Sequence, residues 1–450
     1  MPRGGPPPRL PGRRRGAAPR PAPRREPPMR VLIVGNGIAG GEVAFGLRRA
    51  GSGAEITILS AETTPEYDPC SLPYYLGGEV PRERVFRRRW EDYRAAGIRL
   101  ETGEKAVAID PASRCVRTAS GREHPYDRLV LAHGGSLFVP PIAGIDKRGV
   151  HGCKQLPDAD LLDRHGGSRA VVIGSGAIGI EAAEALKKRG YAVTVIEVMD
   201  WILPALFDPE TAGRLKRRLE RCGIAALTGE KVLRIEGAEA VAAVVTDRRT
   251  IPCDTVVLAT GVVPGVELAR TAGIDVGRGI RVNERLETSL PGIYACGDCV
   301  ETVDACTGED AMFQLKHNAL EQARVVTRNL LGASASYPGA WAFARAHFFD
   351  THAVTFGKTT RATQCELGDL EIVEREAGDD YLRVIVKEGV IAGGQAIGRF
   401  ADAAGLLIGA MWRRESVPAL RARRALLGDG PHGTLPWTTR RLGELLELAG

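Results

Sequence analysis

A glycine-rich pattern that occurs twice constrains the fold of this chain more than any other feature. The first copy, Gly35-Asn36-Gly37-Ile38-Ala39-Gly40, follows an apolar run from Arg30 to Val34 and opens a stretch with helical periodicity. The second copy, Gly174-Ser175-Gly176-Ala177-Ile178-Gly179, follows Ala170 to Ile173 in the same way. One copy can arise by chance in a chain with 55 glycines. Two copies, each between a strand and a helix, predict two βαβ units.

Each glycine of the pattern has a physical reason. The first makes a tight turn, the second lets the backbone approach a pyrophosphate, and the third permits close packing of the helix. A phosphate is also favoured at the N-terminus of that helix. The pattern therefore predicts two dinucleotide-binding sites. The residues assigned to them are Gly35, Gly37 and Gly40 in the first copy, Gly174, Gly176 and Gly179 in the second, and the neighbours Ile38, Ala39 and Ile178.

An acid at the end of the second strand of such a unit indicates which nucleotide binds. Glu197 ends the apolar run that begins at Ala192. A carboxylate there accepts hydrogen bonds from a ribose 2′-hydroxyl and repels a 2′-phosphate, so we expect NADH rather than NADPH at the second site. In the first unit Ser60 ends the strand, and the nearest acid, Glu62, is expected to contact an adenosine ribose.

The net charge of +6 comes from the N-terminus. Residues 1–28 hold eight arginines against one acid, so they carry +7 and residues 29–450 carry −1. This segment has ten prolines and almost no large apolar residue, which predicts disorder. It is either a stretch translated from a start upstream of Met29 or a tail for an anionic partner. Because the remaining residues are nearly neutral, we expect no nucleic-acid partner.

Composition also narrows the location of the protein. No run approaches the roughly 18 apolar residues needed to span a bilayer, and the N-terminus has no apolar signal segment. Nine scattered cysteines fit a reducing compartment better than a disulfide framework. We expect a cytoplasmic protein without a membrane partner and without a metal centre.

Further strands are expected between and after the two units. Ile98 to Val116 and Leu129 to Ala132 predict strands between them, and Thr255 to Gly261 closes the second unit. Beyond Tyr337, Leu382 to Val386 and Val390 to Ala392 predict strands accompanied by late helices. These elements predict a third domain.

This order of motifs resembles the pyridine nucleotide-disulfide oxidoreductases over about residues 29–400. The resemblance implies an α/β fold with two Rossmann-like dinucleotide-binding domains, one for FAD and one for NAD, and a C-terminal α+β interface domain that forms a homodimer. The implied boundaries are 1–28 for the disordered extension, 29–150 for the first part of the FAD domain, 151–270 for the NAD(P)H domain, 271–335 for the return to the FAD domain and 336–450 for the interface domain.

Two segments carry this resemblance in detail. The run from Thr288 to Cys299 is similar to the family segment in which an Asp, here Asp298 after Gly297, accepts a hydrogen bond from the ribityl chain of FAD. In this family an Ala-Thr-Gly turn usually ends both nucleotide-binding domains. The turn of the second domain is intact and ends at Gly261, whereas the turn of the first domain reads Ala132-His133-Gly134. The resemblance assigns Ala132 and Gly134 to FAD and Gly261 to NAD.

Cys70 is the candidate redox residue. The segment from Tyr67 to Gly78 resembles the single-cysteine members of the family, the coenzyme A disulfide reductases, NADH oxidases and peroxidases, in which one cysteine lies beside the flavin. A thiolate can attack a disulfide or cycle through a sulfenic acid. Cys296 and Cys299 have redox-like spacing, but they flank the Gly-Asp pair, and we expect them to be packing residues.

Several positions depart from the relatives. Ile38 stands where peroxidases and water-forming oxidases carry a histidine, and Ala177 stands where an aromatic gates the nicotinamide. Glu42 and Glu66 place two carboxylates where coenzyme A would need basic residues, which argues against that nucleotide. Relatives often have C-terminal tyrosines that reach the flavin of the partner subunit, but after residue 330 this chain has only Tyr337 and Tyr381. His432 is a candidate proton donor to the partner subunit's thiol.

The sequence therefore predicts an oxidoreductase that passes hydride from NADH through FAD and Cys70 to a disulfide, a polysulfide or a related small acceptor. One alternative is an NADH-dependent electron-transfer reductase for a ferredoxin-like or rubredoxin-like protein partner. Another is an NADH oxidase.

Overall fold

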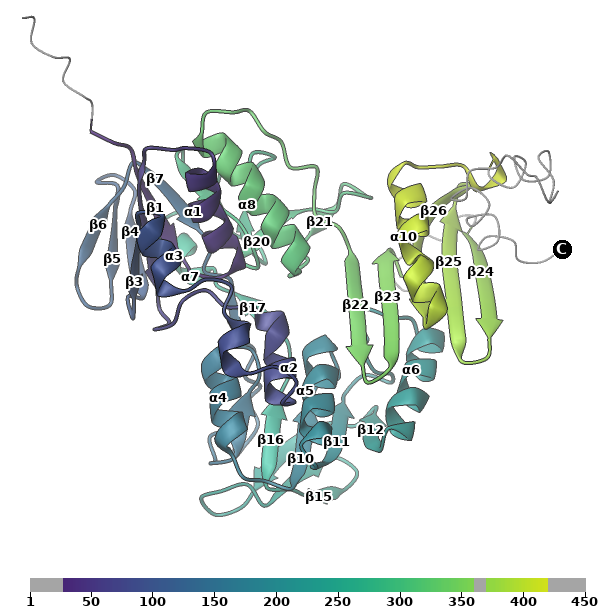
Figure 1. Cartoon of the computed structure of the whole chain (residues 1–450). Helices are drawn as coiled ribbons and strands as arrows, with labels where there is room; N and C mark the ends of the chain where they lie inside the picture. The colour runs from purple at the N-terminus through teal and green to yellow at the C-terminus, as the bar shows by residue number, and fades with distance from the viewer. Residues whose placement is uncertain (1–26, 360–369, 420–450) are drawn as a thin grey trace, which may run out of the picture.

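A five-stranded parallel sheet forms the first layer of the molecule, in a computed structural model that describes residues 27–359 and 370–419 (Figure 1). The strand order is β19-β7-β1-β2-β3, so one strand from late in the chain joins the four early ones. The elements are β1 (Arg30–Val34), α1 (Ile38–Arg49), β2 (Glu55–Ser60), β3 (Ile98–Thr102), β7 (Arg128–Leu131) and β19 (Ile293–Ala295).

Alternate side chains of β1 point to opposite faces of this sheet, and each face is covered by a different layer. Val31 and Ile33 belong to the apolar cluster shared with helices α1 and α8. Leu32 and Val34 belong to the cluster on the opposite face, beneath a small antiparallel sheet. The covering elements are α3 (Trp90–Ala95), α8 (Lys316–Leu330), β4 (Ala106–Asp110), β5 (Cys115–Thr118) and β6 (Glu123–Pro125). The segment predicted as strand from Ile98 to Val116 is thus three strands.

A second five-stranded parallel sheet repeats the first arrangement, with the order β12-β11-β10-β16-β9. Both predicted βαβ units are present, and their central strands β1 and β10 have equivalent places. The parallel strands are β9 (Val150–Gly152), β10 (Arg169–Ile173), β11 (Ala192–Glu197), β12 (Ile224–Thr228) and β16 (Thr255–Leu258), with helices α4 (Leu156–Arg164), α5 (Ala177–Lys188) and α6 (Pro209–Arg221). An antiparallel sheet of β13 (Val232–Glu236), β14 (Ala243–Thr246) and β15 (Thr250–Pro252) lies alongside.

Short elements connect the two parallel sheets. A two-stranded ribbon pairs β8 with β17, and a three-stranded group pairs β18, β20 and β21. A short helical segment follows the first unit and packs against α4 and α5 of the second. These connecting elements are η1 (Pro69–Ser71), α2 (Leu72–Leu76), η2 (Arg82–Val85), β8 (Gly135–Leu137), β17 (Val262–Pro264), α7 (Glu267–Thr271), β18 (Ile280–Arg281), β20 (Val300–Val303) and β21 (Asp310–Ala311).

A five-stranded antiparallel sheet with one covering helix forms the last part of the described chain (Figure 1). The strands expected around Leu382 and Val390 are present and are longer than predicted. Its elements are β22 (Phe343–Phe348), β23 (Thr351–Gly357), β24 (Leu370–Ala377), β25 (Asp380–Lys387), β26 (Val390–Ile397) and α10 (Arg399–Trp412).

The predicted mixed α/β fold with parallel sheets is confirmed. Within residues 27–359 and 370–419, no helix has the length and apolar character that a bilayer crossing requires. Most of the Arg/Pro-rich segment 1–28 and the segment with His432 lie outside the described residues.

Candidate functional site

The first glycine loop has the geometry of a dinucleotide cradle. Gly35 has a φ of +111°, and a Cβ there would lie 2.3 Å from the carbonyl oxygen of Ala132. A Cβ on Gly40 would lie 2.0 Å from the carbonyl oxygen of Gly35. A Cβ on Gly37 would meet nothing within 4 Å. Packing therefore requires the first and third glycines, while the second leaves open space at the N-terminus of α1, where a pyrophosphate fits.

The second loop repeats this geometry closely. Gly174 has a φ of +103°, and its Cβ would lie 2.3 Å from the carbonyl oxygen of Ala259. A Cβ on Gly179 would lie 2.1 Å from the carbonyl oxygen of Gly174, and one on Gly176 would meet nothing within 4 Å. Gly261 also faces open space, and Ile178 is partly exposed at the start of α5. This second cradle fits a second dinucleotide.

Helix α1 and the turn at Gly134 both approach the Gly297–Asp298 turn. A Cβ on Gly297 would lie 3.1 Å from the Cβ of Ala39 in α1, and a Cβ on Gly134 would lie 4.0 Å from the Cβ of Asp298. The Asp298 carboxylate is half-buried, and no hydrogen bond reaches it from the described residues. Burial raises its pKa, and Lys154 opposes that effect. A carboxylate in this state has free acceptor capacity beside the first cradle, which fits the ribityl hydroxyls of FAD.

Cys296 and Cys299 are both fully buried. The Cys299 thiol donates to the carbonyl oxygens of Leu131 and Cys296, at 3.5 Å each. Burial raises the pKa of Cys299 to about 12. Buried, protonated thiols are chemically inert, and this supports the interpretation of both residues as packing residues.

Glu197 is joined to the second glycine loop. One carboxylate oxygen accepts hydrogen bonds from the backbone N–H of Ser175 at 2.9 Å and from its hydroxyl at 2.7 Å. The other oxygen accepts from the backbone N–H of Met199 at 2.9 Å. Glu197 is 7% exposed, and the next residue, Val198, is 62% exposed. The carboxylate therefore fixes the glycine loop at the end of β11, with both of its oxygens hydrogen-bonded within the chain.

Glu62 is placed differently from Glu197. Its carboxylate accepts a hydrogen bond from the Tyr67 hydroxyl at 2.9 Å, and that hydroxyl accepts from the backbone N–H of Leu156 at 3.2 Å. Burial raises the pKa of Glu62. Glu62 thus joins the end of the first unit to the start of α4, a link that the sequence pattern did not indicate.

Cys70 is an exposed residue of η1, which lies between β2 and β3 of the first sheet in sequence and directly precedes α2. Its backbone N–H donates to Asp68 Oδ1 at 3.1 Å, and the other Asp68 oxygen forms an ion pair with Lys316. Desolvation and the charge of Asp68 raise the pKa of the Cys70 thiol to about 11, while Lys316 acts in the opposite direction. At neutral pH the Cys70 thiol of the protein without bound cofactor or substrate is therefore protonated.

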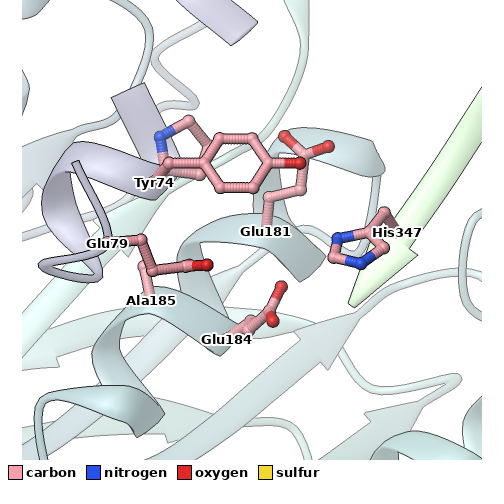
Figure 2. Close-up of a pocket in the computed structure, with 7 residues that line it drawn as sticks. Tyr74, Glu79, Glu181, Glu184, Ala185 and His347 are labelled. Atoms are coloured by element: carbon pink, nitrogen blue, oxygen red, sulfur yellow. The ribbon is translucent and has the colours of Figure 1, made fainter. Parts of the chain in front are cut away.

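A shallow pocket lies beside the Cys70 segment. Figure 2 shows the side chains of Tyr74, Glu181, Glu184 and His347 gathered around one space, from α2, α5 and β22. The Tyr74 and His347 rings stack with centroids 6.4 Å apart. Burial and the neighbouring Glu184 raise the pKa of Glu181 to about 7. Tyr74 belongs to the segment that resembles the single-cysteine members, whereas Glu181, Glu184 and His347 belong to no recognised sequence motif, since their proximity depends on how α5 meets β22.

The carboxylates of Glu42 and Glu66 do not carry free negative charge toward the first cradle. Glu66 is 1% exposed and forms an ion pair with Arg87 Nε at 2.6 Å, and Glu42 pairs with Arg49 at 2.7 Å. Each carboxylate is thus paired with an arginine, which reduces the repulsion that it would exert on a nucleotide pyrophosphate. A Cβ on Gly41 would lie 2.1 Å from Glu66 Oε2, so Glu66 also supports α1.

His133, which interrupts the first Ala-x-Gly turn, has a structural partner. Its Nε2 donates to the carbonyl oxygen of Gly265 at 2.6 Å, and burial lowers the pKa of the imidazole. The ring thus joins the end of β7 to the segment after β17. The late tyrosines are also occupied within the chain, since Tyr337 donates to Asn318 at 3.4 Å and Tyr381 to Glu374.

Comparison with known proteins places this architecture in a family. The family model described as pyridine nucleotide-disulphide oxidoreductase matches residues 29–323. An NADH oxidase of Methanocaldococcus jannaschii is 36% identical over 320 residues, covering 69% of this chain and 71% of the relative. A CoA-dependent NAD(P)H sulfur oxidoreductase of Pyrococcus abyssi is 32% identical over 337 residues, covering 73% and 75%.

Two further relatives show the breadth of the match. A probable ferredoxin reductase, CtmF, of Castellaniella defragrans is 36% identical over 312 residues, covering 67% of this chain and 76% of the relative. The solved structure of an NAD-dependent persulfide reductase from A. fulgidus superposes with a TM-score of 0.85 at 31% identity, covering 92% of this chain and 82% of that one. The chain belongs to the pyridine nucleotide-disulphide oxidoreductases and is a FAD-dependent NAD(P)H oxidoreductase.

Proposed function

We propose that this enzyme takes hydride from NADH and delivers the electrons, through Cys70, to a disulfide, a persulfide or a polysulfide. In this proposal residues 29–150 and 271–335 hold FAD, and residues 151–270 hold NADH. Bound FAD would supply the chemistry of hydride acceptance from NADH and of two-electron transfer toward Cys70. The sulfur oxidoreductase of Pyrococcus abyssi and the persulfide reductase from A. fulgidus support this choice of acceptor.

One chain of contacts carries the proposal for Cys70. Asp68 binds the backbone of Cys70 and is paired with Lys316 at the start of α8. Two residues earlier, the Gln314 side chain donates to the carbonyl oxygen of Asp298 at 3.1 Å. An exposed thiol is thereby attached, through the start of α8, to the loop that fits FAD. A cysteine that only packs has no such attachment and is usually buried.

Each residue has a definite task in this proposal. The backbone of Gly37 and the Asp298 carboxylate orient FAD, and the backbone of Gly176 with Glu197 orients NADH. The Cys70 thiolate attacks one sulfur of the acceptor. The S–S bond of the acceptor breaks, a mixed disulfide with Cys70 forms, and the other half of the acceptor leaves as a thiolate or sulfide. Reduction of that mixed disulfide by two electrons and a proton regenerates Cys70 and releases the second thiol or sulfide.

Electron transfer to an iron-sulfur protein is the second candidate, because the Cys70 thiol has its pKa raised to about 11 and stays protonated without further help. The ferredoxin reductase relative supports it. The NADH oxidase of Methanocaldococcus jannaschii supports oxygen as a third acceptor. In all three cases we propose that residues 336–450 form the interface of a homodimer, which a solution mass of twice 48.2 kDa would test.

The deciding experiment is Cys70→Ser in the FAD-loaded enzyme. We expect NADH to bleach the flavin at the parent rate under anaerobic conditions, while turnover of disulfide and polysulfide falls at least about 100-fold, because the nucleophile is lost. Cys115→Ser is the matched control, a half-buried cysteine on β5 in the small antiparallel sheet. Unchanged sulfur turnover in Cys70→Ser would refute the proposal. Rapid reduction of a ferredoxin by NADH in that variant would establish the electron-transfer alternative.

A further inference from the structure

We propose that Lys316, held in place by Asp68, is a positioning residue for Cys70, and that its ammonium group supports the thiolate form of Cys70 during turnover. This inference rests on the proposed role of Cys70 and assigns a task to a residue 246 positions away in the sequence. Lys316 acts through Cys70 and has no assigned contact with a substrate.

The two oxygens of Asp68 have separate tasks. Asp68 is the N-cap of η1, and its Oδ1 accepts from the backbone N–H of Cys70 at 3.1 Å. Its Oδ2 forms the ion pair with Lys316. The Asp68 side chain is only 18% exposed and that of Lys316 is 36% exposed, so the pair is partly shielded from water. Shielding strengthens the interaction of an ammonium with neighbouring charge.

Helix stability does not explain why a lysine begins α8. The N-terminus of a helix carries a partial positive charge, so a lysine is unfavourable there. No acid lies in the first turn of α8 to compensate. The compensating carboxylate is Asp68, on the segment that carries Cys70. Lys316 therefore adds its charge to that of the helix end at the side of the thiol segment.

Three charged groups act on the Cys70 thiol, each from a different element. Desolvation disfavours a negative sulfur most, followed by the carboxylates of Asp68 on its own segment and Glu181 on α5, and together they raise the pKa of Cys70. Lys316 on α8 favours the negative sulfur. Because a thiolate is the attacking species, a cation that opposes desolvation and two carboxylates increases the fraction of thiolate at a given pH.

The test is the pH profile of Cys70 alkylation by iodoacetamide in the FAD-loaded protein, with peptide mapping to isolate Cys70. We expect Lys316→Met to raise the alkylation midpoint by about one pH unit and to slow alkylation at pH 8 about tenfold. Lys316→Arg should restore the parent midpoint, since it keeps the charge. Asp68→Asn should lower the midpoint, because the amide still accepts from Cys70 but no longer neutralises Lys316.

Lys147→Met is the matched control, since the Lys147 ammonium is an exposed cation that donates to the carbonyl oxygen of Ala238 at 3.0 Å. Melting temperatures identify any variant that fails to fold, and Lys316→Arg and Asp68→Asn then still test the charge effect. An unchanged midpoint in Lys316→Met refutes the role of Lys316, even if Cys70→Ser abolishes sulfur turnover. A shifted midpoint with full sulfur turnover in Cys70→Ser refutes the proposed function and leaves the electrostatic role intact.

Discussion

At the scale of single residues, Glu197 has two tasks that compete for one carboxylate. Both of its oxygens bind backbone groups, through Ser175 on the glycine loop and Met199 after the strand. In the proposed function a ribose hydroxyl binds beside these contacts, where the carboxylate would repel a 2′-phosphate. Val198, the exposed next residue, supplies no cation that would offset this repulsion.

Replacing Glu197 and Val198 together should change the preferred nucleotide from NADH to NADPH. In Glu197→Ala/Val198→Arg the repulsion is removed and a guanidinium is added, and charge-assisted hydrogen bonds contribute about 1.5–3 kcal/mol. We expect the ratio of kcat/KM for NADPH to that for NADH to rise at least about tenfold. Steady-state kinetics with both nucleotides measure it, with Val198→Leu as control. A double variant that still prefers NADH by the parent ratio would show that specificity lies elsewhere.

At the scale of elements, different glycines of each loop serve packing and ligand binding. Gly179→Ala places a methyl group 2.1 Å from the carbonyl oxygen of Gly174, so α5 must move away from its loop. Gly176 has a φ of −64° and a ψ of 178°, which alanine adopts without strain, and its Cβ meets open space. The same type of substitution should therefore have opposite consequences at positions three residues apart.

We expect Gly179→Ala to lower the free energy of unfolding by about 1–3 kcal/mol. Gly176→Ala should change it by less than about 0.5 kcal/mol, yet it should raise the KM for NADH at least about tenfold because the methyl group lies where the pyrophosphate approaches. Chemical unfolding and stopped-flow reduction of the flavin measure the two effects. Equal destabilisation by both substitutions would contradict the assignment of these glycines.

Local patterns predicted these elements well, because apolar periodicity and glycine spacing act over a few residues. Both βαβ units, the small strands after Ile98 and the late antiparallel strands follow from such patterns. Contacts between distant segments do not. The pairs Asp68–Lys316 and His133–Gly265 form only after the two sheets are in place, and so does the neutralisation of Glu42 and Glu66 by arginine. Sequence motifs therefore identify Cys70 as a candidate redox residue, but they do not predict the charged groups that surround it.

At the scale of the whole molecule, charge joins the second sheet to the antiparallel sheet. Helix α6 faces the hairpin of β24 and β25, and Arg221 of the helix pairs with Asp379 of the hairpin at 2.7 Å. Beneath this exposed layer lies Arg383, whose side chain is 9% exposed and whose Nε is 3.6 Å from the fully buried Asp208. The backbone N–H of Asp208 donates to the Gln395 side chain at 3.1 Å. The inner layer is thus buried and the outer layer is open to water.

Burial determines which of these ion pairs matters for stability. Arg383→Met removes a nearly buried guanidinium from both Asp208 and Glu374, and breaking a buried ion pair costs about 3–5 kcal/mol. Arg221→Met removes a pair whose side chains are 59% and 65% exposed, which contributes at most about 1 kcal/mol. We expect a clear fall in the melting temperature for Arg383→Met alone, measured at low and high salt, since salt screens the exposed pair far more than the buried one. Equal shifts for the two variants would contradict the dependence on burial, because the exposed pair would then stabilise the protein as much as Arg383 does.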